Sequence, residues 1–487
     1  MQTVDIDMYT ECFILFDECE KLVQDVHYRD SIREPMNDFF RFQNKALISA
    51  TPIVPEKDSR FDGFMRVLIQ PDYVYRQKLK LITTNNVLET LQEVIEAKRG
   101  TVCIFCNSID SIDSFYRLIP ELSNACTFCS EDGQYKLWKG NRRKKSMMIT
   151  ELERYNFFTS RFYSAVDILC KNPPHVIFVS DLYGAAQSVI DPATEAIQII
   201  GRFRGGVNSV THIASIRPEL ECMSSSEIDH WIQGASTIFN GWKAQLTRTT
   251  NIGERTLLQE AIGENSYLPY LDENGKPDSF LIANFYEKEQ VKRLYTSADL
   301  LHLAYEQTGY FVFSHEERLM PVSDNERMAI QHRLAKKKRA ELIVRKLEEM
   351  EKMSRATDKK IQKRYQRMLM NLITSTADRY IYDCFCRFGA KFVREADYNE
   401  NKLRTALNVS SEHTIKKSGQ MRTYIQRAFP VGAEISVQEA KSMLRQVYKK
   451  MGLNTGRGIT TKELEQYAEI ENSRNREARM IKILKHK

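Results

Sequence analysis

Short apolar runs alternate with amphipathic stretches through the first 217 residues, and this alternation restricts the fold more than any other feature of the sequence. Short runs rich in Val, Ile and Phe are typical of buried strands, while apolar spacings of three and four indicate helices. The pattern predicts an α/β fold with a parallel sheet covered by helices. The expected strands are Phe13–Asp17, Ala46–Ser49, Lys78–Ile82, Val102–Cys106, Ala125–Cys129, Ser146–Thr150, Val176–Ser180 and Val210–Ser215, and the expected helices are Asn86–Ala97 and Ser108–Leu118.

The charge is divided unevenly along the chain. Residues 1–327 hold 35 Lys+Arg against 46 Asp+Glu, a net of −11, whereas residues 328–487 hold 36 against 18, a net of +18. Basic blocks of this kind indicate a polyanion partner, because each phosphate that they neutralise releases a condensed counterion. A solvated, charged helix face is the alternative explanation.

Beyond residue 217 the sequence divides into four further regions. Residues 218–325 change to aromatic residues and mixed turns, and we interpret them as an accessory region of unassigned fold. Residues 326–398 predict a basic helical segment, because residues 326–373 lack Pro and Gly and place apolar side chains at helical spacing. These side chains are Ile343, Leu347, Met350, Ile361, Tyr365, Met368 and Leu372. Residues 399–472 predict a small helical module and residues 473–487 a polar basic tail, so the C-terminal part should be mainly helical.

The sequence carries no pattern for secretion or membrane insertion. No apolar run approaches the roughly 18 residues that a membrane helix needs. The N-terminus lacks the order of a signal peptide. The ten cysteines are scattered along a large chain, which argues against a disulfide framework. We therefore expect a cytoplasmic protein without a membrane partner.

The segment FILFDECE, residues 13–20, is an apolar strand that ends in the consecutive acids Asp17 and Glu18. Nucleotide hydrolysis uses one carboxylate at a strand end to hold the Mg²⁺ water shell and a second beside it to activate the attacking water. Alone, the pattern is more typical of a solvated strand end.

Four further segments follow this acidic box in order: KALISATPI at residues 45–53, TVCIFCNSI at 101–109, FFTSRFYSAVDI at 157–168 and QIIGRFRGG at 198–206. Together the five segments resemble motifs II to VI of the superfamily 2 helicases of the DEAD/DEAH class, with a general likeness to those of phages and mobile elements. The resemblance covers about residues 10–217. It implies two RecA-like lobes, with ATP and Mg²⁺ between them and a nucleic-acid strand across both. Residues 1–75 would be part of the first lobe and residues 76–217 the complete second lobe.

The resemblance gives roles to residues of the first lobe. Asp17 would hold the Mg²⁺, and Glu18 would act as the general base. Ser49 and Thr51 would couple the state of the nucleotide to closure of the lobes.

The second lobe would supply the opposite wall of the nucleotide site. The resemblance implies that Thr159 and Ser160 contact the nucleic-acid backbone and that Asp167 lies near the nucleotide. Gln198 and Arg202 would face the phosphates. Arginine suits this role, because its planar, permanently charged fork can offset the charge that builds on the γ-phosphoryl oxygens.

The last box departs from the family pattern. The family has a second arginine seven residues after the glutamine, but here position 205 is Gly and the arginine stands one earlier, at Arg204. Either Arg204 reaches the γ-phosphate through an altered turn and acts as the arginine finger, or only Arg202 acts on the phosphates. Alternatively, both arginines merely pair with acids.

A phosphate-cradling Gly-Lys-Ser/Thr loop is missing from the sequence. The nearest match, Gly275-Lys276-Pro277, is typical of a turn. In the family this loop precedes the acidic box by roughly a hundred residues, yet Asp17 is the seventeenth residue here. We therefore expect the front of the first lobe to be missing, and residues 1–75 to be poorly ordered alone or completed by another chain.

Two further patterns have competing interpretations. Cys103-x-x-Cys106 and Cys126-x-x-Cys129 match the spacing of a zinc ribbon, but β-forming residues lie between each pair, and residues three apart on a strand point to opposite faces. We interpret these cysteines as strand residues. Lys336, Lys337, Lys338 and Arg339 lie on the basic helical segment, where they form a nucleic-acid or partner-docking surface or an idle solvated face.

Two functional hypotheses follow. The first is an ATP-dependent helicase or translocase fragment that acts on nucleic acid, with DNA favoured over RNA, and whose hydrolysis needs a first lobe supplied by a longer protein or a separate chain. The second is a catalytically inactive DNA-binding or assembly protein that retains the second lobe.

Overall fold

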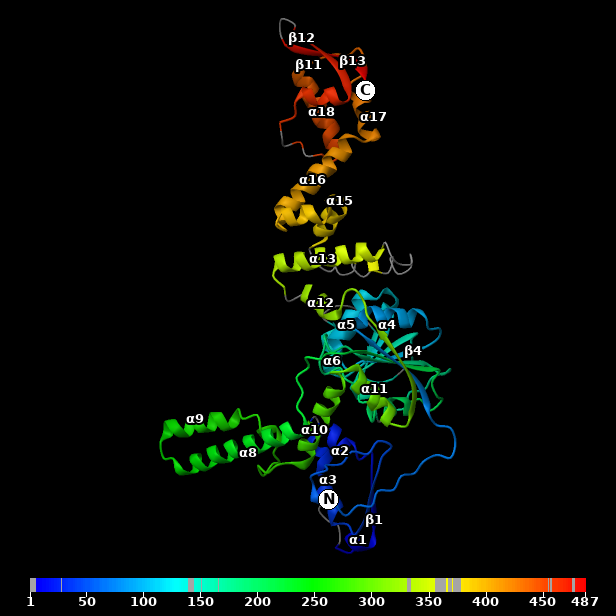
Figure 1. Cartoon of the computed structure of the whole chain (residues 1–487), viewed down its shortest axis with the longest axis vertical. Helices are drawn as coiled ribbons and strands as arrows, with labels where there is room; N and C mark the ends of the chain where they lie inside the picture. The colour runs from blue at the N-terminus through cyan, green and yellow to red at the C-terminus, as the bar shows by residue number, and fades with distance from the viewer. Residues whose placement is uncertain are drawn as a thin grey trace. The chain divides into compact units, whose positions relative to one another are not determined.

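The computed structural model describes residues 6–27, 29–138, 144–149, 151–164, 166–330, 334–354, 365–366, 370, 378–453, 455, 458–474 and 478–487. The chain divides into two compact units, Met1–Met328 and Ala329–Lys487 (Figure 1). Each unit is described by itself. The first unit confirms the expected α/β class, because its centre is a large parallel sheet.

The described residues of the first unit form an eight-stranded sheet of order β10-β3-β9-β8-β4-β7-β5-β6. Every neighbouring pair is parallel. The strands are β3 (Gln77–Thr84), β4 (Val102–Phe105), β5 (Cys126–Phe128), β6 (Lys144–Ser146), β7 (Tyr155–Phe158), β8 (His175–Ser180), β9 (Ser209–Ser215) and β10 (Phe311–Arg318).

Most strands predicted in this region are confirmed, one is displaced, and one further strand was not predicted. The strand expected at Ser146–Thr150 lies earlier, at Lys144–Ser146. The central strand β7, Tyr155–Phe158, was not predicted. It includes Asn156, a residue that strands disfavour. The Asn156 side chain is buried and donates to the carbonyls of Glu153 and Val102, so tertiary contacts satisfy its polarity.

Both faces of the large sheet are covered. On one face α4 (Val87–Glu96) and α5 (Ile109–Leu118) pack on Ile104 and Phe157. Asn86 and Ser108 cap these helices by accepting the backbone N–H of Glu89 and Ser111, as their positions in the sequence predict. Burial on both faces explains why the strands are continuously apolar rather than alternating.

The second face carries an aromatic core. Phe105 and Phe178 of the sheet pack there with apolar residues of α7 (Glu195–Gly201). Tyr295, which directly follows α10 (Ser279–Leu294), and Tyr305 of α11 (Ala298–Gln307) complete this core. These tyrosines come from the region expected to be a separate accessory part. The sheet therefore extends past residue 217, and β10 at its edge pairs with β3.

The expected boundary at residue 217 is too early because a long insertion separates β9 from β10. The insertion contains α8 (Ser225–Arg248) and α9 (Ile252–Gly263), which pair as a helical hairpin. Ser224 begins α8 in a capping box with Glu227. The strand that completes the sheet is thus far along the chain from the strands that precede it.

A second parallel sheet, two-stranded within the described residues, joins β1 (Phe13–Asp17) to β2 (Asn44–Ile48). Around it lie α1 (Ile6–Glu11), α2 (Lys21–Gln24) and α3 (Pro35–Arg41). One face of the sheet presents Ile14, Phe16 and Leu47 to a core with Phe39 and Phe280. The opposite face is bare: Phe13 is 64% exposed, Leu15 53% and Ile48 45%.

The described residues of the second unit include the helices α13 (Lys336–Ser354), α15 (Arg379–Glu395), α16 (Glu400–Lys416), α17 (Gly419–Ala428) and α18 (Val437–Lys450). Ile343 and Leu347 are buried on α13, as their spacing predicts. Ile361, Met368 and Leu372 lie outside the described residues.

The C-terminal residues correct two predictions. The module expected to be helical contains a three-stranded sheet in the described residues, in which β13 (Arg479–His486) lies between β11 (Glu434–Ser436) and β12 (Ala468–Arg474). The expected basic tail is therefore mostly the central strand of this sheet. Its apolar residues Ile481 and Ile483 are buried at alternate positions, the period of two that is typical of a strand, whereas the prediction gave weight to the net basic charge of the segment.

Candidate functional site

The acids of the first box lie at the carboxyl end of β1. Asp17 is the last residue of the strand, and its Oδ1 accepts the backbone N–H of Glu18 at 2.8 Å. Glu18 has a φ of 53°, in the left-handed region that non-glycine residues rarely adopt. Strained residues of this kind cluster at functional sites. The turn at Glu18 leads the chain directly into α2.

The end of β2 lies beside the same turn. The backbone N–H of Cys19 donates to the Ile48 carbonyl, which ties the turn to β2. Ser49 Oγ then accepts the backbone N–H of Thr51 at 2.9 Å, and Thr51 is buried. The segment with Ser49 and Thr51, which was predicted to couple nucleotide state and lobe closure, therefore meets the acidic box.

Gln198 of α7 reaches this junction from the large sheet. Its Nε2 donates to Glu20 Oε1 at 2.7 Å and to Thr51 Oγ1 at 2.8 Å, and its Oε1 accepts from Lys21 Nζ at 3.1 Å. All four side chains belong to residues that are less than a tenth exposed. One buried amide thus connects three segments that are far apart in the sequence.

Arg202, one helical turn after Gln198, faces the acidic box. Its Nη2 lies 3.8 Å from Glu18 Oε1, and its Nε donates to the Gln198 carbonyl at 3.2 Å. The arginine side chain is 15% exposed and that of Glu18 is 40% exposed. The distance is long for an ion pair, so the backbone contact holds the guanidinium and leaves its outer donors available.

Arg204 has a different partner. Its Nε contacts Asp167 Oδ1 at 3.0 Å, and both side chains are largely exposed. Exposed pairs contribute about 0–1 kcal/mol. Of the two arginines between which the sequence could not decide, Arg202 is the one that reaches the acids of β1.

Thr159 and Ser160 follow β7, at the carboxyl edge of the large sheet. Thr159 is buried, and its hydroxyl donates to the Phe128 carbonyl at 3.4 Å. Ser160 is exposed and begins a short 3-10 turn. Only Ser160 of this pair therefore presents its hydroxyl to solvent.

Several residues at the junction were not singled out from the sequence. Glu20 and Lys21 follow the acidic pair directly and contact Gln198. Glu20 Oε2 is buried without a hydrogen-bond partner among the described residues. An orphaned buried carboxylate oxygen indicates a place where a further donor or a hydrated cation would be stabilised.

Three carboxyl groups lie behind Gln198: Asp191 is buried, and Glu195 and Glu287 are partly buried. Burial raises the pKa of Glu195 to about 8 and that of Glu287 to about 7, and it also raises the pKa of Asp191. Gln24 of α2 donates to Thr194 Oγ1 and to Glu287 Oε1, at 3.0 and 3.3 Å. The cluster thus connects α2 to α7 and α10. No local sequence pattern marks these acids, because their burial depends on helices that are distant in sequence.

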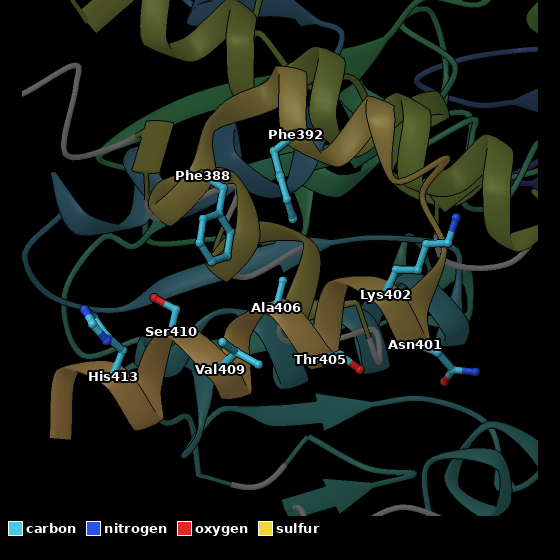
Figure 2. Close-up of a pocket in the computed structure, with 9 residues that line it drawn as sticks. All are labelled: Phe388, Phe392, Asn401, Lys402, Thr405, Ala406, Val409, Ser410 and His413. Atoms are coloured by element: carbon cyan, nitrogen blue, oxygen red, sulfur yellow. The ribbon is translucent and has the colours of Figure 1, made fainter. Parts of the chain in front are cut away.

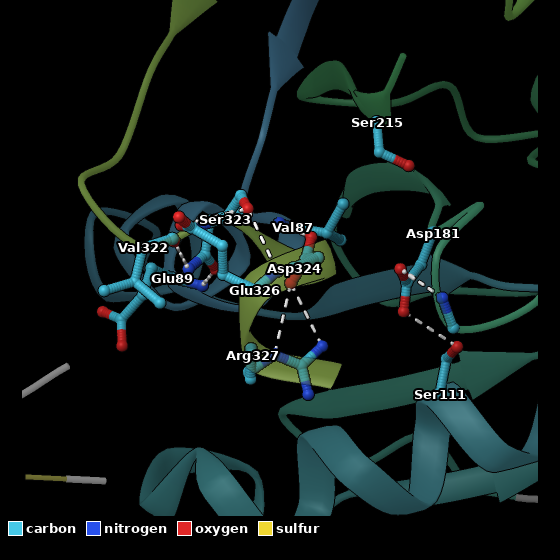
Figure 3. Close-up of polar contacts among 12 residues, drawn as sticks. Val87, Glu89, Ser111, Asp181, Ser215, Val322, Ser323, Asp324, Glu326 and Arg327 are labelled. Carbon is cyan, nitrogen blue, oxygen red and sulfur yellow. Dashed lines mark hydrogen bonds and ion pairs between the residues drawn. The ribbon is translucent and has the colours of Figure 1, made fainter. Parts of the chain in front are cut away.

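The carboxyl end of β3 is closed by the chain itself (Figure 3). The Asn85 side chain exchanges two hydrogen bonds with the backbone of Met320, and Asp324 Oδ2 accepts the Val87 N–H of α4 at 2.6 Å. Arg327 pairs with the buried Asp324 at 3.1 Å. The segment after β10 therefore covers this part of the edge where open α/β sheets bind ligands.

The basic residues of α13 are mostly engaged with acids of the second unit. Lys336 pairs with Glu400, Lys337 with Asp397 and Arg339 with Asp378. Lys338 is exposed. Much of the charge that predicted a nucleic-acid surface here thus stabilises contacts between helices.

The residues at the junction fit a nucleotide–Mg²⁺ group in part. Magnesium in such sites is held by one or two carboxylates together with substrate phosphates and water. Asp17 and Glu18 offer two such carboxylates. In the described part of the chain no three His, Cys, Asp or Glu side chains are grouped closely enough to hold a metal by themselves.

Comparisons of the sequence give no relative: no family model matches the chain, and neither does any curated protein. Among the described residues, no helix is both long and apolar enough to pass through a membrane.

Proposed function

We propose that the first unit is the hydrolytic part of a nucleic-acid motor of the superfamily 2 helicase type. The observation that carries the proposal is the approach of Arg202 and Gln198 to the acids of β1, with Arg202 Nη2 at 3.8 Å from Glu18 Oε1. In this proposal β1 and β2 belong to a first RecA-like lobe, and the large sheet is the second. Their side chains face one ATP from opposite walls.

Each residue at the two walls has a task that its chemistry suits. Bound ATP with Mg²⁺ would supply the γ-phosphoryl group and the charge that polarises it. Asp17 would hold the metal's water shell, and Glu18, which is partly exposed, would take a proton from the attacking water. Arg202 would offset negative charge from the second wall.

The buried amide of Gln198 would couple the two walls. It bonds to Glu20 and Thr51 of the first wall at 2.7 and 2.8 Å. A shift of either wall breaks these bonds, and the loss of a hydrogen bond to a buried charged group costs about 1.5–3 kcal/mol. The state of the acidic box would thus bias the separation of the walls.

A phosphate-binding loop would have to come from additional polypeptide. The bare face of the small sheet supports this part of the proposal, because parallel sheets are almost always covered on both faces. Phe13, Leu15 and Ile48 on that face are about half exposed or more. The same polypeptide would extend the open edges of β1 and β2.

Nucleic acid is the proposed substrate, with DNA favoured over RNA. A polyanion partner is supported by the charge of residues 329–487, which hold 36 basic residues against 18 acidic ones. Exposed Ser160 at the edge of the large sheet also supports it. In the described residues of α13, Lys338 is an exposed member of the basic run.

An ATPase assay tests the proposal. Turnover is measured for the full chain with and without single-stranded DNA, and again after adding a candidate first-lobe polypeptide. We expect DNA-stimulated turnover, with Glu18→Gln reducing it by about a hundredfold or more and the exposed control Glu56→Gln leaving it unchanged.

The second candidate is a catalytically inactive DNA-binding or assembly protein. The absence of a Gly-Lys-Ser/Thr string from the sequence favours it. Salt-sensitive DNA binding without turnover under every condition of the assay would support this candidate and overturn the first.

A further inference from the structure

An open groove of about 770 Å³ lies between α15 and α16 of the second unit (Figure 2). Phe388 and Phe392 form the wall that α15 contributes, and both rings point toward α16. Ala406 lies on α16 opposite them, where its small side chain leaves room. The groove is within the volume range of sites that bind small ligands or parts of larger ones.

The wall that α16 contributes carries a stripe of polar side chains around the apolar Ala406 and Val409, and most of the exposed surface of the groove is apolar. The polar residues are Asn401, Lys402, Thr405, Ser410 and His413. Figure 2 shows Lys402 and His413 toward opposite ends of this stripe. Side chains of these types can donate hydrogen bonds, and most hydrogen bonds between proteins and nucleic acids go to phosphate and sugar oxygens.

The electrostatics of the groove favour an anion. None of the nine residues that line it, all in the described part of the second unit, is acidic. Two nearby acids are paired elsewhere, Glu400 with Lys336 and Arg404, and Glu395 with Lys391, while Glu412 precedes His413 on α16. Residues 329–487 as a whole carry a net charge of +18.

The two phenylalanines provide flat apolar surface beside this polar stripe. Their ring centroids are 4.7 Å apart at an interplanar angle of 41°, and both side chains are only half-buried. Val409, on the opposite wall, is 52% exposed. Aromatic side chains next to a cationic groove are the usual platform for unpaired bases, because every base has a π-face that can stack.

We propose that this groove binds single-stranded nucleic acid, with phosphates along α16 and bases against Phe388 and Phe392. The proposal shares only its class of ligand with the proposed motor function and requires no nucleotide hydrolysis. The competing occupant is an amphipathic helix of a protein partner. Such a helix would need apolar side chains in the groove, but it would not need them to be flat aromatic rings.

Binding of fluorescein-labelled oligothymidine to the full chain, followed by anisotropy without ATP, tests the proposal. Val409→Glu places an acid in the middle of the groove, whereas Asn408→Glu places the same charge about 100° around the helix. We expect Val409→Glu to weaken binding about tenfold or more and Asn408→Glu about twofold or less. Equal effects of the two variants would overturn the proposal.

Phe392→Leu separates stacking from general apolar packing, because leucine keeps most of the volume but has no flat ring. Loss of a stacked base costs about 1–3 kcal/mol, so we expect oligothymidine affinity to fall at least about fivefold. Wild-type affinity for oligothymidine in this variant would overturn the proposal. The proposal would also be overturned if an acidic amphipathic peptide displaced oligothymidine and bound the variant as tightly as it binds the wild type. This assay measures binding and not ATP turnover. Its result therefore remains valid even if the motor proposal is wrong.

Discussion

The two parallel sheets of the first unit differ in how far the chain itself completes them. The eight-stranded sheet is covered on both faces, and Phe105 at its centre contacts four other aromatic rings. The two-stranded sheet is covered on one face only and exposes Phe13, Leu15 and Ile48 on the other. Both have the same hydrogen-bonding pattern, yet only the larger one buries the apolar surface that parallel sheets require. The acids that we propose to take part in hydrolysis lie at the end of the incomplete sheet.

The largest expected effect is a loss of stability when the core of the large sheet is changed. Phe105→Ala removes a fully buried ring from the large sheet, which we expect to lower the free energy of unfolding by about 3–5 kcal/mol. Urea denaturation followed by circular dichroism measures this loss. A change below about 1 kcal/mol would mean that the large sheet is not the stable part of the unit.

The contact between the two sheets depends on one amide. Gln198→Ala removes the side-chain partner of Glu20 and of Thr51 and one of the two partners of Lys21, so we expect a loss of about 1–3 kcal/mol in the same assay. The exposed control Gln233→Ala should change stability by less than about 0.5 kcal/mol. If both variants behave alike, the two sheets are not held together at this junction.

The acid Glu195 behind the junction makes the free energy of unfolding depend on pH. Burial raises the pKa of Glu195 to about 8 from an ordinary value of 4.5, so the folded state keeps a proton that the unfolded state releases between these values. Stability therefore falls as the pH rises through this window, by about 1.4 kcal/mol per unit for one proton. Glu195→Gln cannot ionise and should flatten the dependence, as measured by denaturation midpoints from pH 5 to 9. An unchanged slope in the variant would contradict this assignment.

The smallest effect is expected on the bare face of the small sheet. Leu15→Ser exchanges a side chain that is 53% exposed, so we expect a change in unfolding free energy within about 0.5 kcal/mol. Light scattering should show less self-association, because the variant removes exposed apolar surface. A loss as large as that of Phe105→Ala would show that this face is buried in the folded chain.

Sequence patterns predicted local features of the large sheet well. β4, β8 and the capped starts of α4 and α5 follow from residues that are adjacent in the chain. β10 was not predicted because its pairing with β3 depends on residues separated by the whole α8–α11 insertion. β13 was not predicted because its many basic residues led to the interpretation of a solvated tail, although its buried isoleucines alternate with exposed residues as in a strand.

The sequence named residues that meet at one junction in the structure, but it did not give the geometry of this candidate site. The motif positions named Asp17, Glu18, Gln198 and Arg202, which the fold brings to one junction. The choice between Arg202 and Arg204 could not be made from the sequence, since it depends on the direction in which each side chain leaves the end of α7. The contact of Glu20 with Gln198 was missed for a similar reason, because it depends on the path of the chain after the left-handed turn at Glu18.

The most direct test of the account compares the two arginines in DNA-stimulated ATP hydrolysis, with the first-lobe polypeptide present. Because Arg202 faces Glu18 and Arg204 pairs with exposed Asp167, we expect Arg202→Gln to lower turnover about a thousandfold or more. Arg204→Gln should lower it by no more than about threefold, since an exposed pair contributes little. Equal losses in the two variants, or full turnover in Arg202→Gln, would contradict the claim that β1 and α7 hold one nucleotide between them.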